Sequence, residues 1–169
     1  MTSSDLVLQQ VLGNETLQRM IDEQTRKDDT KYGVGHGLNL PVLEDLSLYI
    51  INGFDFSGLN LSGMHAYKTI FHQCRFVGAD LYGADFDETV AQEADFRQAT
   101  LAKAVFSGAD LSGAKFDNAN LIQTDFMNCN LKGATFRDAD FSGGLVSDCN
   151  IEEAIFGPGY VQIKQSIEK

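Results

Sequence analysis

Residues 79–88 read ADLYGADFDE and residues 109–118 read ADLSGAKFDN, so each stretch holds two five-residue units of one design. From Phe56 to Phe156 an apolar residue returns at every fifth position. The residue two places before it is mostly Ala, with Cys or Thr as the usual exceptions. A period of five fits neither an α-helix nor a flat strand. A long, regular period indicates stacked identical units, which form a solenoid.

Apolar centres that lie twenty residues apart fall into columns of like residues. A spacing of fifteen would instead mix Phe, Ala and Leu within a column, so we expect four units per coil. Identical rings in successive coils, about 4.8 Å apart, should stack in offset fashion and hold the register. Residues 54–156 then give about five coils at twenty residues per coil. One column holds only phenylalanine: Phe56, Phe76, Phe96, Phe116, Phe136 and Phe156.

This pattern resembles the pentapeptide-repeat family, whose repeat reads Ala-Asp/Asn-Leu/Phe-x-x. The resemblance covers residues 54–156. It implies an all-β solenoid, namely a right-handed quadrilateral β-helix in which each unit forms one side of a coil. It also implies that the apolar centre and the small residue two places before it point inward, while the other three residues point outward.

Outward charges alternate in sign along the expected columns. One column reads Asp55, Arg75, Asp95 and Lys115, and a second column contains Arg97, Asp117 and Arg137. This order avoids like charges on neighbouring strands, which are destabilising. Because an exposed ion pair contributes only about 0–1 kcal/mol, we expect these ladders to set the register more than the stability.

Residues 1–53 lack the five-residue period, and we expect a helical N-terminal cap followed by a glycine-containing loop. Ser4 is a candidate cap for a first short helix that ends at Gly13, and Asn14 is a candidate cap for a second. Both helices are short, so they need a surface to pack on. We expect them to cover the open end of the solenoid, and recognition of a partner is a compatible second role.

Residues 157–169 are predicted to form a C-terminal cap. Gly157-Pro158-Gly159 breaks the repeat, and Tyr160, Ile163 and Ile167 then recur at helical spacing. The family resemblance implies that this end forms the subunit contact in dimeric relatives, so Tyr160 is a candidate contact residue in a homodimer.

Composition narrows the range of partners. The formal net charge is −11, which disfavours direct contact with nucleic acid or an anionic membrane. No apolar run reaches the roughly 20 residues of a membrane span, and the first twenty residues do not resemble a signal peptide. The three cysteines include no CxxC pair, which favours a reducing compartment. We therefore expect a cytoplasmic protein.

Nothing in the sequence indicates catalysis, a cofactor or a metal site. The three histidines are scattered and have no Cys or carboxylate at zinc-ligand spacing. A core filled by Phe, Leu and Ala leaves no concave site of the kind that enzymes use. Cys129 and Cys149 should stack at the small inward position, either as a disulfide of poor geometry or, as we favour, as buried free thiols.

Some outward positions are apolar, and they are the candidate protein-interaction residues. Ile122 lies below Ala102 and Tyr82 in one expected column, while Val105, Met127 and Leu145 lie on the adjoining side. A continuous apolar patch of this kind would mark a protein–protein surface. The favoured function is therefore a rigid, non-enzymatic protein–protein interaction module, with specificity in residues 1–53 and on these columns.

An acidic surface supports an alternative function. The family includes proteins that mimic DNA in shape and charge, bind DNA gyrase, and inhibit it or protect it from quinolones. Six acids with no base among them form the candidate surface: Asp80, Asp85, Asp87, Glu88, Glu93 and Asp95. They circle one coil, whereas a DNA mimic needs acids along the rod. We therefore rank a gyrase-binding DNA mimic second.

Overall fold

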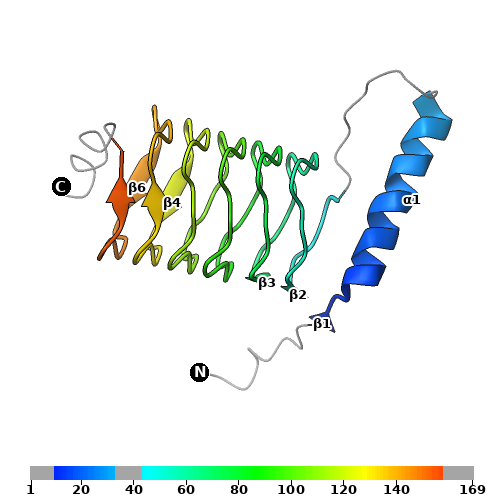
Figure 1. Cartoon of the computed structure of the whole chain (residues 1–169), viewed down its shortest axis with the longest axis horizontal. Helices are drawn as coiled ribbons and strands as arrows, with labels where there is room; N and C mark the ends of the chain where they lie inside the picture. Colours follow the sequence, from blue (N-terminus) through cyan, green and yellow to red (C-terminus); the bar gives the residue numbers. More distant parts are fainter. Residues whose placement is uncertain (1–9, 33–42, 158–169) are drawn as a thin grey trace.

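The coils of the chain stack into a rod, and helix α1 (Asn14–Tyr32) lies at its N-terminal end (Figure 1). The computed structural model describes residues 10–32 and 43–157. Strands β1 (Gln10–Val11) and β2 (Tyr49–Asn52) are followed by five further short strands. They are β3 (Ile70–His72), β4 (Asp125–Met127), β5 (Thr135–Phe136), β6 (Leu145–Ser147) and β7 (Ile155–Phe156).

All strand pairs are parallel and most join residues twenty apart. Strand β2 pairs with β3, β4 with β6, and β5 with β7 in this register. Single-residue bridges continue the same offset from Asp45–His65 to Asn130–Asn150. Four five-residue units therefore complete one turn of the β-helix, as the columns of like residues predict.

The phenylalanine column forms a continuous stack through the core. Ring centroids of successive members are 4.7–5.0 Å apart, and their planes lie within 6° of parallel. Phe86, Phe106 and Phe126 form a second stack of the same geometry. Rings of the two stacks meet edge to face. These offset and perpendicular contacts are the arrangements that aromatic pairs prefer, so the expected stacking is confirmed.

Each side of the coil ends in a tight turn with a left-handed residue. Every fifth residue from Leu48 to Glu153 has a positive φ. Within the turn, the N–H of Ala84 donates to the carbonyl of Leu81 at 3.1 Å, and Gly83 has φ 63°. This hydrogen bond and a positive φ at the third residue are those of a type II turn. Glycine suits that position because it has no Cβ, a feature that the apolar positions alone do not predict.

The threonines that replace alanine at the small inward position are buried and hydrogen-bonded. The hydroxyl of Thr89 donates to the carbonyl of Ala66 at 2.7 Å, and that of Thr124 donates to the carbonyl of Leu101 at 2.7 Å. Both acceptors lie twenty-three residues earlier, in the coil above. A buried hydroxyl is costly without a partner, and this repeated bond supplies one.

The N-terminal segment differs from the expected pair of helices. The first expected helix is wrong where the structure describes it, because Gln10 and Val11 form β1, which pairs in parallel with Tyr49 and Ile50 of β2. A short helix alone is marginal, whereas pairing with β2 satisfies backbone groups at an open sheet edge. The second expected helix is present as α1.

Helix α1 packs on the rod through its first half. Leu17 is fully buried and Ile21 nearly so, and both belong to the main core. Glu15 in the first turn suits the positive end of the helix dipole. These contacts place the start of α1 against the N-terminal coils.

The ladder begins before residue 54, the expected start of the repeat, because Asp45 already bridges His65. Leu46 and Ile51 fill the inward centre positions and are fully buried. At the other end, the predicted C-terminal helix and Tyr160 lie outside the described residues. No helix in the described ranges is both long enough and apolar enough to cross a membrane.

Candidate functional site

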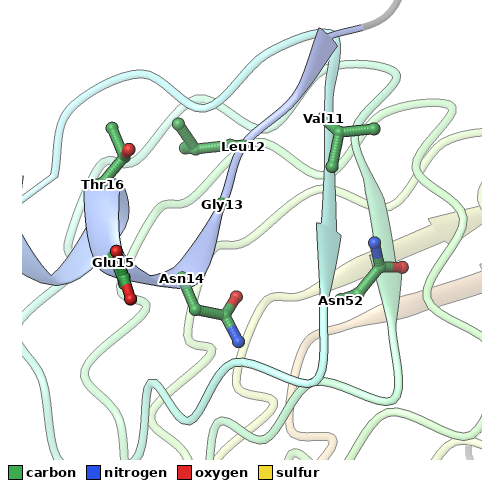
Figure 2. Close-up of a pocket in the computed structure, with 7 residues that line it drawn as sticks. All are labelled: Val11, Leu12, Gly13, Asn14, Glu15, Thr16 and Asn52. Carbon is green, nitrogen blue, oxygen red and sulfur yellow. The ribbon is translucent and has the colours of Figure 1, made fainter.

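A pocket of about 450 Å³ opens where β1 leads into α1 (Figure 2). Val11 and Asn52 line one side and residues 12–16 line the other, so strand β2 and the first turn of α1 both contribute. Glu15 is its sole titratable side chain. Its other polar side chains are the Thr16 hydroxyl and the amides of Asn14 and Asn52, so the lining holds no pair of titratable groups.

Most side chains of the expected acidic surface accept hydrogen bonds from backbone N–H groups. Asp80 accepts a hydrogen bond from the N–H of Tyr82 at 3.1 Å, and Asp85 accepts one from the N–H of Asp87 at 2.9 Å. Aspartate and asparagine favour this bond to the backbone two residues on. The same bond recurs at Asp45, Asp55, Asn60, Asp95, Asp110, Asn120, Asn130, Asp140 and Asn150. The acids of this position therefore have a structural role that their charge alone does not reveal.

The remaining acids of this surface have other contacts. Asp87 accepts a bond from the N–H of Ser107 in the next coil at 2.8 Å, and burial raises its pKa. Glu88 forms an ion pair with Lys68 at 3.2 Å. Glu93 is exposed and packs its Cγ near Gly113. Because Glu88 is paired with Lys68 and Asp95 with Arg97, the six acids do not form an unbroken run of unpaired negative charge.

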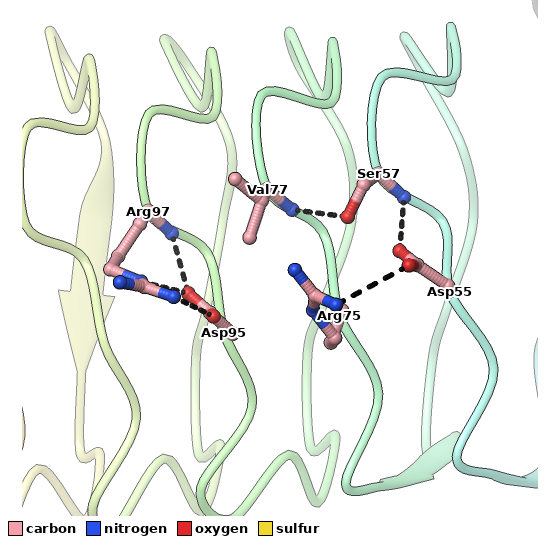
Figure 3. Close-up of polar contacts among 6 residues, drawn as sticks. All are labelled: Asp55, Ser57, Arg75, Val77, Asp95 and Arg97. Carbon is pink, nitrogen blue, oxygen red and sulfur yellow. Dashed lines mark hydrogen bonds and ion pairs between the residues drawn. The ribbon is translucent and has the colours of Figure 1, made fainter.

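The charge ladders differ in detail from the expected columns (Figure 3). Asp55 and Arg75 pair across coils at 3.6 Å, as expected. Asp95 instead binds Arg97 of its own coil, with Nε–Oδ1 and Nη2–Oδ2 distances of 2.7 and 2.6 Å. Hydrogen bonding from the Arg97 guanidinium lowers the pKa of Asp95.

The second charge column forms one of its two expected pairs. Arg137 pairs with Asp117 across coils at 3.4 Å. The pair between Asp95 and Arg97 lies within one coil, so it does not link neighbouring coils. The pair between Asp117 and Arg137 does link them.

The candidate apolar residues lie on both sides of one corner of the rod. Val105 and Met127 are exposed, and so is Tyr82, while Ile122 and Leu145 are partly buried. Tyr82 and Ile122 lie in one column but are separated by buried Ala102.

Acids interrupt this corner patch, which consists of Tyr82, Val105, Ile122, Met127 and Leu145. Val105 and Leu145 both pair with Asp125 in the ladder, so a carboxylate lies between them, and Asp85 pairs with Val105 from the coil above. The expected patch is therefore broken along its main column.

A longer apolar column lies on the side of the rod next to the one that carries Val105, and it was not predicted from the sequence. Val11 of β1 pairs with Ile50, Ile50 pairs with Ile70, and Ile70 pairs with Val90. Val11 is 67% exposed and the other three are partly exposed. We call these four residues the N-terminal stripe. The spacing of Ile50, Ile70 and Val90 could have shown it, since these residues are twenty apart in an outward position.

The three cysteines are free. Cys129 and Cys149 lie one coil apart, and the N–H of Cys129 donates to the Cys149 sulfur at 3.3 Å. In the described parts of the chain, no group of three or more His, Cys, Asp or Glu side chains could hold a metal ion.

These features define a β-helix solenoid built of five-residue units. A family model described as pentapeptide repeats, in eight copies, matches residues 55–90, 79–118 and 104–143. The three matches together span residues 55–143, which is more than half of the chain. The chain belongs to the pentapeptide repeat family, whose fold is a right-handed β-helix solenoid.

Several solved structures are similar to this chain. A pentapeptide repeat protein from the thylakoid lumen of Arabidopsis thaliana is 28% identical, with 58% of this chain and 68% of that chain covered and a TM-score of 0.32. Rfr23, a pentapeptide repeat protein from the cyanobacterium Cyanothece 51142, is 18% identical, with 64% of this chain and 84% of that chain covered and a TM-score of 0.34. A trypsin-treated variant of QnrB1, a plasmid-mediated fluoroquinolone resistance protein, is 18% identical. The match covers 70% of this chain and 85% of that chain, with a TM-score of 0.30. No curated protein matches the chain in sequence.

Proposed function

We propose that this chain is a rigid, non-enzymatic protein-binding module, and that a partner protein binds it through an apolar surface centred on the N-terminal stripe. The observation that carries the proposal is the uninterrupted column of β-branched side chains from Val11 to Val90. Contiguous exposed apolar surface is characteristic of protein interaction sites.

The surroundings of the stripe suit a protein partner better than a small ligand. The column lies on parallel strands in register, which present a flat surface to the outside of the rod. Tyr67 is 38% exposed at the adjacent corner, and its hydroxyl donates to Glu88 at 3.1 Å. Aromatic side chains beside an apolar centre are enriched in protein interfaces.

The stripe also unites the two regions that the sequence indicates for specificity. Val11 belongs to the N-terminal segment, whereas Ile50, Ile70 and Val90 belong to successive coils. Binding there would require β1 and the repeat together. The corner patch is the weaker candidate because Asp85 and Asp125 separate its members.

The acidic surface supports the alternative of a gyrase-binding DNA mimic less well. Four of its six acids accept backbone N–H bonds, and a fifth, Glu88, is paired with Lys68. A DNA mimic depends on negative charge that a partner can reach, and the pairing of Glu88 with Lys68 and of Asp95 with Arg97 offsets part of that charge.

The test compares three variants with the wild type in affinity capture and in solution mass. Ile70→Asp disrupts the stripe and Met127→Asp disrupts the corner patch. Ile155→Asp is the matched control, since it makes the same exchange at an exposed ladder position outside both apolar surfaces. We expect one protein, identified by mass spectrometry, to be lost with Ile70→Asp and retained with the other two.

Two outcomes would contradict the proposal. Loss of the partner with Met127→Asp alone would move the site to the corner patch. A wild-type chain that is dimeric, and that becomes monomeric with Ile70→Asp, would make the stripe a self-association surface. Far-UV circular dichroism of each variant verifies that the β-helix is intact.

A further inference from the structure

Cys129 and Cys149 occupy neighbouring places in one inward column near the C-terminal end of the rod. Cys129 is 2% exposed, whereas Cys149 is only partly buried. Cys149 is therefore the thiol of the pair that solvent reaches.

The Cys149 sulfur lies against the backbone of Cys129. The Cys149 sulfur already accepts a hydrogen bond from the backbone N–H of Cys129, while the Cys129 thiol donates to the carbonyl of Phe106 in the coil above. Turning the Cys129 side chain about its Cα–Cβ bond to another staggered position breaks its bond to Phe106. An S–S bond to Cys149 requires the Cys129 sulfur to leave Phe106 in this way.

The two cysteines also differ in the direction of their pKa shifts. The interaction between the two cysteine side chains lowers the pKa of Cys149 and, together with burial, raises the pKa of Cys129. A thiolate is the nucleophilic form of cysteine, so Cys149 is the member suited to attack. Cys74 offers the contrast, because burial raises its pKa to about 11.

We propose that Cys149 and Cys129 form a reversible redox-modification site that reacts with hydroperoxides. The Cys149 thiolate attacks one peroxide oxygen, the O–O bond breaks, and the other oxygen leaves as hydroxide or alkoxide and takes a proton from water. Cys149 is then a sulfenic acid.

Cys129 completes the reaction. Its sulfur displaces the hydroxyl group of the Cys149 sulfenic acid, the Cys129 thiol proton leaves with that hydroxyl as water, and an S–S bond forms. Overall, one hydroperoxide is reduced to water or an alcohol, one further water is released, and two thiols are oxidised. The product links two successive coils near the end of the rod, and a dithiol reductant reverses it.

The test treats the folded full chain with hydrogen peroxide and counts thiols after denaturation. We expect the count to fall from three to one, since Cys129 and Cys149 are consumed and Cys74 is not. The intact mass should fall by two hydrogen atoms, and dithiothreitol should restore three thiols. Peptide mapping of the wild type assigns the bond without any variant.

Two variants sharpen the result. Cys74→Ser should still form the bond and lose both remaining thiols. In Cys129→Ser the resolving thiol is absent, so Cys149 should instead gain one or more oxygen atoms. The proposal is overturned if treated wild type keeps three thiols, if Cys74 is the first thiol oxidised, or if the product is a dimer linked between chains on a non-reducing gel.

Discussion

The ring of Phe76 stacks on that of Phe96, with centroids 4.8 Å apart and planes 6° from parallel. Phe96 in turn stacks on Phe116 at 5.0 Å and is fully buried. Truncation of a buried Phe loses both its transfer free energy and its packing. We therefore expect Phe96→Ala to lower the free energy of unfolding by about 3–5 kcal/mol.

Denaturant unfolding followed by circular dichroism measures this loss. Phe96→Leu is the control, because it keeps most of the apolar volume and removes the ring, so its loss should be clearly smaller. Equal losses in the two variants would mean that ring stacking, and not core volume, dominates at this position.

The left-handed turn residues give a second prediction. Gly83 has φ 63° and open space where a Cβ would lie, so Gly83→Ala tests backbone conformation without a clash. We expect a loss of about 1 kcal/mol in unfolding free energy, because an L-residue is disfavoured in this region.

Gly13 provides the matched position for this comparison. It too has open space where a Cβ would lie, but its φ is outside the left-handed range. Gly13→Ala should leave the unfolding free energy unchanged or slightly raised, since Ala restricts the unfolded chain. A similar loss in both variants would show that the effect at Gly83 does not come from its φ.

The Asp95–Arg97 pair predicts a dependence of stability on pH. Hydrogen bonding from Arg97 lowers the pKa of Asp95 in the folded chain below its unfolded value. The stability that this carboxylate contributes is thus fully present above the unfolded value of about 4. It is lost as pH falls through the lower folded value.

We expect Asp95→Asn to be less stable than wild type at neutral pH, with a difference that shrinks as the pH falls below about 4. Urea unfolding across this range measures the difference, and acids whose pKa does not depend on Asp95, such as Asp140, titrate alike in both proteins. A difference that stays constant with pH would contradict the assigned pairing.

The acidic surface predicts a negative result with DNA gyrase. Most of these acids accept a backbone N–H bond or form an ion pair. We therefore expect a large excess of the chain to leave gyrase supercoiling unchanged. The comparison protein carries Asn in place of Asp80, Asp85, Asp87, Glu88, Glu93 and Asp95. At positions 80, 85 and 95 Asn keeps the side-chain oxygen that accepts the turn N–H, so the variant chiefly removes charge. Inhibition by wild type that the variant lacks would instead support the DNA mimic.

The amino-acid sequence alone determined the repeating part of the fold. The spacing of five predicts the inward positions, and the spacing of twenty predicts which residues stack, down to the ring column that contains Phe76 and Phe96. This prediction succeeds because every coil repeats the same contacts, so a local pattern specifies a neighbour twenty residues away. The thiol neighbours Cys129 and Cys149 follow from the same rule.

The tertiary structure decided the features that do not share this period. Val11 pairs with Ile50 across thirty-nine residues, and no repeat predicts that pairing, so the Val11 end of the N-terminal stripe could not be predicted and β1 was expected to be helical. Asp95 binds Arg97 of its own coil because the guanidinium reaches it there, although the columns predicted pairs between coils. Where contacts depend on an open sheet edge or on the reach of a side chain, only the folded arrangement selects among the available partners.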